Sequence, residues 1–325
     1  MKTRALFAAL TLTLVSFFPS NAFEAPPKIA IAYDIGFLGD NSYNDAVNQA
    51  LVIAEKRYGL SEPYVREVPT NGTAVDRLSR IRFLAKSGYT LIITVGAGYR
   101  ETVRRVSTEY PEIQFAIIND NVLGQMNISN ISFKESDGAY LAGVLAASVT
   151  KRNFVGFVGS EPDLLASFSK GVRTTSKKVK VINIPYPDEI ESLKSALSKV
   201  DVAYSTWDGD ASVLSVVAES FPKGLGLIAE RPDQYFASLP GAQKFLTGTV
   251  EKSLVKPIDQ LFLAALRGRA IIDILDEQQG IYGREYSVKN NGIFLNLLSP
   301  RAKKANSRID AAVSAIKSGK VSTTP

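Results

Sequence analysis

Short apolar runs alternate with longer segments of helical periodicity along most of this chain. The apolar runs are residues 28–33, 90–95, 114–118, 154–158, 179–184, 201–205 and 225–228. Helical patterns lie between them, at about 42–58, 74–87, 98–109, 136–150, 162–176, 189–199 and 210–220. Continuous apolar runs of this length are typical of buried parallel strands. Their alternation with helices predicts an α/β fold with doubly wound parallel sheets, and seven or more strands favour two sheets over one.

Two lobes are expected to share this chain through more than one connection. No low-complexity linker separates the two halves, although a single flexible tether between domains usually has such a composition. We therefore expect several ordered hinge crossings, at Phe133–Lys134, residues 247–249 and residues 280–284. The resulting division is 28–133 plus about 250–280 for lobe 1, and 134–249 plus about 281–319 for lobe 2. Lobes joined in this way close around a ligand by hinge bending.

Polar clusters follow several of the predicted strands. Residues 34–44 follow the first strand, and Gly96 opens a Gly-Ala-Gly-Tyr turn after another. Further clusters are residues 119–121, 206–210 and 230–234. Ligands of open α/β sheets bind beyond the carboxyl ends of the strands, so these clusters predict the rim of a cleft. The Gly96 turn lacks the third glycine of a dinucleotide fingerprint, which favours a tight turn that lines the cleft.

The N-terminus predicts export from the cytoplasm. Lys2 and Arg4 precede an apolar run at residues 6–18, and Ser20-Asn21-Ala22 follows it. This is the pattern of a signal peptide, which we place at residues 1–22. No later run reaches ~18 apolar residues, so we expect no membrane insertion of the mature chain. With no cysteine in 325 residues, lipidation is not expected, and the periplasm is the predicted location.

Composition narrows the classes of function. The formal charge is +6, and the basic residues are scattered along the sequence, so nucleic-acid binding is not expected. The absence of histidine and cysteine removes the commonest general base and the commonest zinc ligands. We expect a monomer with no metal and no cofactor. The enzymatic alternative left open is a hydrolase that uses the carboxylates of Asp34, Asp40 and Asp120.

Three longer motifs resemble those of one known family. They are "DIGFLGDNSYND", "FAIINDNVLGQMNISNISFKESDGAYLAGVLAA" and "FVGFVGSEPDLLASFSKGV". They are similar to segments of the basic membrane protein family, which comprises substrate-binding proteins of ABC transporters that typically bind purine nucleosides. The resemblance runs from about Lys28 to Ala265. It implies a type I periplasmic-binding-protein fold, a nucleoside-like ligand and an ABC permease as partner.

The resemblance also implies roles for single residues. Tyr43 would stack on the base, and Asn44 and Asp120 would bind its edge, with Asp120 preferred to Asn119 by its spacing from Asn127. Lys252 would contact the ribose. An ordinary solvated helix lysine is the alternative for Lys252.

Two departures from the family pattern lie in the second lobe. Arg231 occupies the position of a ribose-binding aspartate, and Trp207 and Asp208 replace small residues. A guanidinium prefers a carboxylate or phosphate partner and cannot accept a hydrogen bond from a hydroxyl. The polar half of the ligand is therefore expected to differ from that of an ordinary nucleoside, for instance by an acidic group.

The remaining candidates come from their positions. We expect Trp207 to face Tyr43 across the cleft, although a core position is the alternative for each ring. Asp34 either lines the site or braces its loop, and Ser42 is expected to cap the following helix. The predicted ligand-binding set is Asp34, Tyr43, Asn44, Gly96, Asp120, Phe168, Trp207, Asp208, Arg231 and Lys252. The leading hypothesis is a solute-binding protein, and a sensory or interaction protein with an altered cleft is the alternative from another class.

Overall fold

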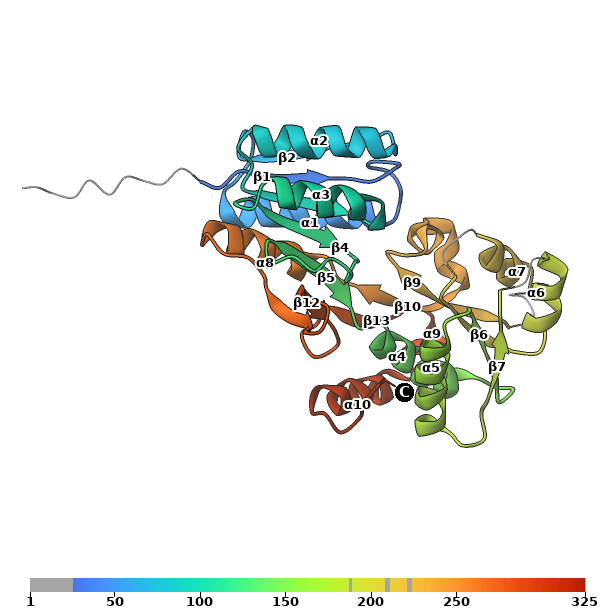
Figure 1. Cartoon of the computed structure of the whole chain (residues 1–325). Coiled ribbons are helices and arrows are strands. Elements are labelled where there is room, and N and C mark those ends of the chain that lie inside the picture. Colours follow the sequence, from blue (N-terminus) through green and yellow to red (C-terminus); the bar gives the residue numbers. More distant parts are fainter. Residues whose placement is uncertain (1–25, 187–188, 208–210, 221–223, 325) are drawn as a thin grey trace, which may run out of the picture.

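Two α/β lobes, each built on one sheet, make up the molecule (Figure 1). The structure is a computed structural model that describes residues 26–186, 189–207, 211–220 and 224–324. The first sheet has the strand order β11-β12-β5-β4-β3-β1-β2, and the second has the order β13-β10-β9-β8-β6-β7. Among the strand pairs of the described residues, only β11–β12 and β10–β13 are antiparallel, so both sheets are dominated by parallel pairing, as the alternation predicts.

Lobe 1 encloses its sheet between helices on both faces. Its strands are β1 (Ile29–Ala32), β2 (Val65–Val68), β3 (Leu91–Val95), β4 (Gln114–Ile118), β5 (Ile128–Phe133), β11 (Asp273–Asp276) and β12 (Ile281–Tyr286). Along β1, Ile29 and Ile31 pack with helices α1 (Tyr43–Tyr58) and α8 (Val255–Leu266). Ala30 and Ala32 face α2 (Ala74–Lys86) and α3 (Arg100–Glu109), which follows the short 3₁₀ turn Ala97–Tyr99. Burial on both faces explains why such strands are continuously apolar.

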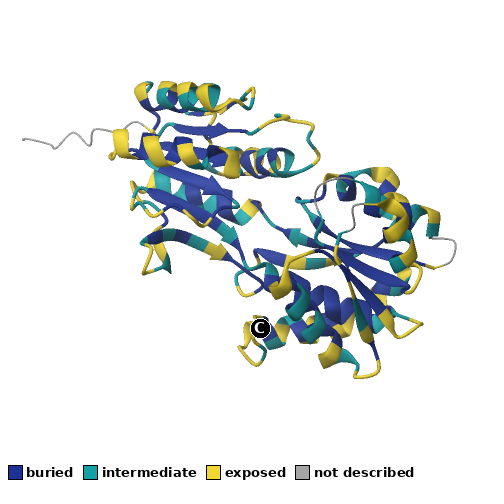
Figure 2. Ribbon diagram, turned by 45° about the vertical axis from the view of Figure 1, so that its right-hand side comes forward, coloured by how far each residue is buried: buried dark blue, intermediate teal, exposed yellow. Residues whose placement is uncertain are grey.

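Lobe 2 repeats this layering. Its strands are β6 (Phe154–Val158), β7 (Lys180–Ile184), β8 (Val202–Ser205), β9 (Gly226–Arg231), β10 (Leu246–Lys252) and β13 (Ile293–Leu297). One face carries α4 (Glu135–Val149), α5 (Pro162–Thr175), α9 (Pro300–Lys303) and α10 (Asn306–Lys317). The other carries α6 (Ile190–Leu197), α7 (Ser212–Ser220) and two 3₁₀ turns, Tyr235–Ser238 and Pro240–Phe245. In Figure 2 the buried residues gather along the strands and on the inner faces of the helices.

Within residues 26–324, apart from the short stretches that are not described, the chain passes between the lobes three times. The first passage is at Lys134, between β5 and α4, as predicted. The second follows Lys252, at the end of β10, so the prediction of a crossing at 247–249 is wrong, because these residues pair with β9. The third lies between β12 and β13, so the prediction at 280–284 is also wrong, because β12 pairs with β5 of lobe 1. Sheet membership therefore divides the chain a few residues later than predicted at both places.

Helix α4 is the most deeply buried helix described, with thirteen of its 15 residues buried. It crosses α5 at two glycines that permit unusually close approach. A Cβ atom built on Gly143 would lie 2.1 Å from the carbonyl oxygen of Phe168, and one on Gly171 would lie 2.1 Å from that of Tyr140. Among the described residues, no helix has the length and hydropathy needed to cross a bilayer.

Candidate functional site

The loop before α1 is organised by two carboxylates. Asp40 accepts hydrogen bonds from the backbone N–H groups of Ser42 (2.8 Å) and Asn44 (3.0 Å), which are among the unpaired donors of the helix start. Asp45 accepts from the N–H groups of Gly39 (2.7 Å) and Asn41 (2.8 Å). Asp40 therefore does the capping that was predicted for Ser42, whose hydroxyl has a different partner.

Asp34 and Asn44 brace this loop from inside. The Asn44 amide is buried and donates to the carbonyl oxygens of Asp34 and Ile35, at 3.3 Å each. The Asp34 carboxylate accepts from Arg77 (2.5 Å) and from the N–H of Ile35 (2.8 Å). Both residues lie at the predicted strand end, and the polar contacts described here are to other groups of the protein.

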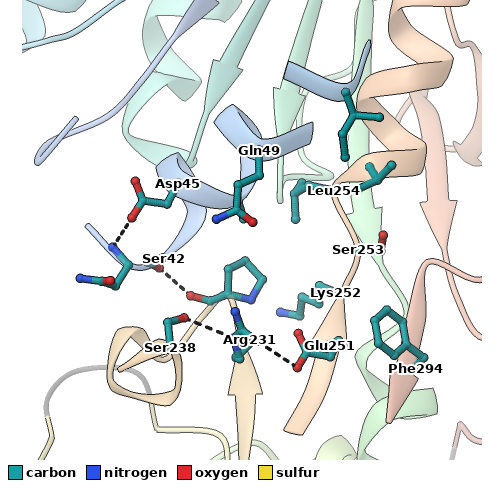
Figure 3. Close-up of a pocket in the computed structure, with 15 residues that line it drawn as sticks. Ser42, Asp45, Gln49, Arg231, Ser238, Glu251, Lys252, Ser253, Leu254 and Phe294 are labelled. Carbon is teal, nitrogen blue, oxygen red and sulfur yellow. Dashed lines mark hydrogen bonds and ion pairs between the residues drawn. The ribbon is translucent and has the colours of Figure 1, made fainter. Parts of the chain in front are cut away.

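The first turn of α1 docks onto lobe 2. The Ser42 hydroxyl donates to the carbonyl oxygen of Pro232 at 2.6 Å, a bond visible in Figure 3. The Tyr43 hydroxyl donates to Asp233 Oδ1 at 2.9 Å. Burial, followed by the charge of Asp233, raises the pKa of Tyr43 well above its ordinary value, so this phenol keeps its proton. The two bonds join the lobes directly at the first loop.

Lys252 is the centre of a buried ionic network at the end of β10. Its side chain is 2 % exposed, and its ammonium lies 2.6 Å from Asp233 Oδ1 and 2.5 Å from Glu135 Oε1. It also lies 3.4 Å from the Tyr43 hydroxyl. Burial lowers the pKa of Lys252, but Asp233, Tyr43, Glu135 and Glu230 together raise it well above the ordinary value. The lysine is therefore charged and contacts residues from both lobes.

A carboxyl group at the edge of this network holds a proton near neutral pH. Glu230 is buried and accepts a hydrogen bond from the Tyr204 hydroxyl. Burial is the main cause that raises the pKa of Glu230. Asp233 and Glu135 also raise this pKa and Lys252 lowers it, and the result is a pKa of about 8. The network thus places one lysine beside three carboxyl groups, those of Asp233, Glu135 and Glu230.

One acceptor in this network lacks a partner. Asp233 Oδ2 is buried and accepts no hydrogen bond from the described part of the chain. Buried carboxylate oxygens are nearly always bonded to a donor. Asp233 lies between the Tyr43 hydroxyl and the Lys252 ammonium, at the junction of the lobes.

A cavity of about 410 Å³ adjoins the network at the junction of the lobes (Figure 3). Asp45 and Gln49 of α1 line it from lobe 1, and Ser238, Phe294 and the ends of β9 and β10 line it from lobe 2. Arg231 and Lys252, both in the predicted ligand-binding set, also line this cavity. Its volume lies in the range of small-molecule sites.

Arg231 presents part of its guanidinium to that cavity. Its Nε donates to the Ser238 hydroxyl at 3.2 Å, and its Nη1 lies 3.5 Å from Glu251. The side chain remains 36 % exposed. Burial raises the pKa of Glu251. Arg231 can therefore still donate to an anionic or carbonyl group that enters the cavity.

Gly96 and Asp120 lie at the carboxyl ends of β3 and β4, beside the loop of Asp34. Gly96 has φ of +88°, which favours glycine, and a Cβ there would lie 3.5 Å from Asp34 Oδ2. The Asp120 side chain has no exposed surface. It pairs with Arg100 at 2.6 Å and accepts from the N–H of Val122 at 3.0 Å. The fold thus gathers the predicted lobe 1 residues at one sheet edge, with both carboxylates paired to arginines.

Two aromatic side chains of the predicted ligand-binding set, Phe168 and Trp207, pack against rings of their own lobe. Phe168 is fully buried, and its ring centroid lies 5.8 Å from that of Phe157 and 5.5 Å from that of Tyr204, so it belongs to the core. Trp207 stacks on Tyr186 of its own lobe, with ring centroids 3.8 Å apart and ring planes inclined by 11°. Asp208 lies outside the described residues.

Sequence reasoning missed several members of the site. Asp233 stands in a loop that was identified as polar, but only its neighbour Arg231 was chosen there. Glu135 begins a helix and carries no motif, because only the fold brings it to Lys252. Arg77 and Arg100 likewise show no signal in sequence. The described residues contain no cluster of three potential metal ligands.

Comparison with known proteins agrees with this architecture. Residues 27–206 match the model of the family described as ABC transporter substrate-binding protein PnrA-like. The CD4+ T-cell-stimulating antigen of Listeria monocytogenes is 27 % identical over 215 residues, which cover 60 % of this chain and 58 % of the antigen. The ABC transporter nucleoside-binding protein BmpA of Lactococcus lactis is 28 % identical over 154 residues, which cover 47 % of this chain and 44 % of BmpA. The chain thus spans about half the length of these curated relatives.

Solved structures with the same fold cover nearly the whole chain. A solute-binding protein of an ABC transporter system from Conexibacter woesei has a TM-score of 0.66 at 17 % identity, covering 91 % of this chain and 98 % of its own. A transcriptional activator of the comK gene from Bacillus halodurans has a TM-score of 0.67 at 18 % identity, and the match covers 89 % of this chain and 97 % of the activator. At such identities the likeness shows the two-lobed fold alone.

Proposed function

Because the chain belongs to the PnrA-like family of ABC transporter substrate-binding proteins, we propose that it captures a nucleoside-like small molecule between its lobes and delivers it to an ABC permease. The proposal places the protein in the periplasm, after removal of residues 1–22, as an unlipidated monomer. It assigns the protein no catalytic activity, no cofactor and no nucleic-acid partner.

The observation that carries this proposal is the unpartnered oxygen of Asp233. It is buried between an aromatic ring of lobe 1 and a charged lysine of lobe 2. A ribose hydroxyl is a donor that this oxygen can accept, while Lys252 donates to a neighbouring ligand oxygen. Asp233 would thereby supply the carboxylate that the family pattern has at the position of Arg231.

Lobe 1 would bind the base. Stacking of a base on the Tyr43 ring contributes roughly 1–3 kcal/mol by analogy with single-stranded nucleic-acid sites. The amide of Asn44 and the carboxylate of Asp120 would bind the base edge only after exchanging their present partners, the loop carbonyls and Arg100. The site therefore rearranges locally when the ligand enters.

Arg231 would set the preference for the polar half of the ligand. Its remaining N–H donors face the cavity beside Lys252, where a carboxylate or phosphate group is a better partner than a hydroxyl. Nucleosides that carry an acidic group are accordingly the expected ligands at this end.

Ligand binding would act by population shift. A molecule that contacts Tyr43 on one lobe and Asp233 on the other gains both sets of contacts only when the lobes are closed, so binding favours closure. A permease could then distinguish the closed form from the open form.

The hydrolase alternative is not favoured by the geometry. Of its three carboxylates, Asp40 holds the start of α1, and Asp34 and Asp120 are paired with arginines. None of the three is therefore poised as a free general acid or base.

The test is ligand binding by the protein after refolding to remove bound molecules. Purine and pyrimidine nucleosides and their monophosphates are titrated by calorimetry, with thermal unfolding in parallel. A ligand at a hundred times its Kd should stabilise the fold by about 2.7 kcal/mol.

Variants on one helix supply the control for this test. Tyr43→Ala should abolish binding, whereas Tyr58→Ala removes a ring of the same helix that contacts only lobe 1 and should leave the affinity within about twofold. A response to none of these compounds would contradict the proposal and favour the alternative of a sensory or interaction protein.

A further inference from the structure

Seven exposed cations occupy one end of lobe 2. We call this group the basic end, and its members are Lys151, Arg152, Arg173, Lys177, Lys178, Lys180 and Lys199. They come from three stretches of the sequence, Lys151-Arg152, residues 173–180 and Lys199. The fold is what brings them together.

The parallel sheet explains this gathering. Residues 151–152 precede β6, residues 177–178 precede β7 and Lys199 precedes β8, and the amino ends of parallel strands share one edge. Two hydrogen bonds confirm the proximity. The backbone N–H of Lys180 donates to the carbonyl oxygen of Asn153 at 2.9 Å, and Arg152 Nη1 donates to that of Ser198 at 3.0 Å.

The charges at the basic end are not neutralised. Within the described residues none of the seven forms an ion pair, whereas Arg57, Arg82 and Arg284 of lobe 1 each do. Asp201 is a carboxylate at this edge, but it is buried and already accepts from Thr150, Lys151 N and Arg301. Uncompensated like charges repel one another, and an anionic partner relieves that repulsion.

The composition of the basic end favours a lipid surface over a protein. Five of the seven cations are lysines, and lysine is depleted at protein–protein interfaces. An anionic bilayer attracts cations by number rather than by geometry, at about 1 kcal/mol for each Lys or Arg near the surface. Phe154, the first residue of β6, is 40 % exposed among these cations and supplies the aromatic side chain typical of interfacial binding.

We propose that the basic end binds the surface of a membrane rich in anionic phospholipids. It lies at the amino edge of the sheet, and in Figure 1 the turn between α5 and β7 is at the end of lobe 2 remote from lobe 1. The cleft is at the opposite, carboxyl edge, so the lobes remain free to open and close on the bound protein. This inference does not depend on the identity of the cleft ligand.

The test is co-sedimentation of the folded protein with vesicles. Vesicles of phosphatidylcholine with about one-third phosphatidylglycerol should bind the protein at about 0.1 M salt and release it at about 1 M, where screening extends over only ~3 Å. Vesicles of pure phosphatidylcholine should bind none.

Two triple variants separate the basic end from total charge. K177Q/K178Q/K180Q should lower the affinity for anionic vesicles about a hundredfold, which is three cations at about 1 kcal/mol each. The control K56Q/K86Q/R267Q removes three exposed cations of lobe 1 and should change the affinity less than threefold. F154S, which removes the apolar contact, should also weaken binding to anionic vesicles at about 0.1 M salt.

Four results would overturn the proposal. They are equal binding to both kinds of vesicle, no binding to either, an equal loss in the control triple, and retention of the wild type on polyglutamate but not on vesicles. The last would identify an acidic protein segment as the partner. Calorimetric titration of the K177Q/K178Q/K180Q variant with nucleosides distinguishes this proposal from that for the cleft, because the cleft should be unaffected.

Discussion

At Glu230 the fold buries a carboxyl group beside two others and a single lysine. Its pKa of about 8 contrasts with an ordinary value of 4.5 in the unfolded chain. Between these pH values the folded protein holds a proton that the unfolded chain releases. The stabilisation is complete below pH 4.5 and is lost as the pH rises through 8, because the unfolded state then binds fewer protons than the native state.

We therefore predict that stability falls as the pH rises from about 5 to 8.5, and that Glu230→Gln flattens this dependence. Glutamine keeps an oxygen that accepts from Tyr204 and carries no charge at any pH. Urea denaturation at several pH values measures the effect. Some slope should remain in the variant, because burial also raises the pKa of Glu251. An unchanged slope in the variant would show that Glu230 does not hold the proton.

At the scale of elements, the crossing of α4 and α5 depends on the absence of two side chains. Gly143→Ala or Gly171→Ala would place a methyl group 2.1 Å from a backbone carbonyl oxygen, so the helices must separate. Overpacking of this kind costs about 1–3 kcal/mol or more. Thermal or urea unfolding measures the loss.

Gly241→Ala is the matched control for that prediction. Nothing lies within 4 Å of its Cβ position, and its φ is not positive, so the substitution should change stability by less than about 0.5 kcal/mol. If Gly143→Ala and Gly171→Ala were as mild as this control, the close crossing would be wrong.

Strands with mainly apolar sequences could be predicted, whereas strands interrupted by polar residues were mostly missed. The seven predicted strands are all present, and most of them are runs of apolar side chains. The exception is β7, an edge strand in which Lys180 and Asn183 are exposed. β2 was missed because its sequence, VREV, has two exposed charged residues in its middle. β11 lies at a sheet edge and exposes Ile274, so no apolar pattern marks it.

The residues of the site likewise divide into those that the sequence could predict and those that it could not. Polar loops after parallel strands placed Tyr43 and Arg231 at the junction of the lobes, because topology alone puts strand ends together. The stacking of Trp207 on Tyr186 could not be predicted, because it depends on packing within lobe 2. The contact of Glu135 with Lys252 joins positions 117 residues apart and has no local signature.

At the scale of the whole molecule, two hydrogen bonds hold the first loop against lobe 2. We predict that the double variant Ser42→Ala/Tyr43→Phe shifts the ligand-free protein towards an open form. A neutral hydrogen bond contributes about 1 kcal/mol and one to a charged group about 1.5–3, so the closed form should lose roughly 2–4 kcal/mol.

The absence of native cysteine allows this shift to be measured with two labels. Cysteines at Lys86 and Ser195, exposed on different lobes, report the distance between the lobes by energy transfer. Tyr58→Phe is the control, because the Tyr58 hydroxyl bonds to Asp259 within lobe 1. A distance that is equal in the double variant and in the control would mean that these bonds do not hold the lobes together.

The two hydrogen bonds should also produce different patterns of substitution among related sequences. Tyr43 and Asp233 interact through side chains, so a change at one position alters the selection on the other. Ser42 donates to a main-chain carbonyl, which every residue at position 232 provides. Positions 42 and 232 can therefore change independently although the two residues are in contact. A search for correlated substitutions would detect the contact of Tyr43 with Asp233 and miss the contact of Ser42 with Pro232.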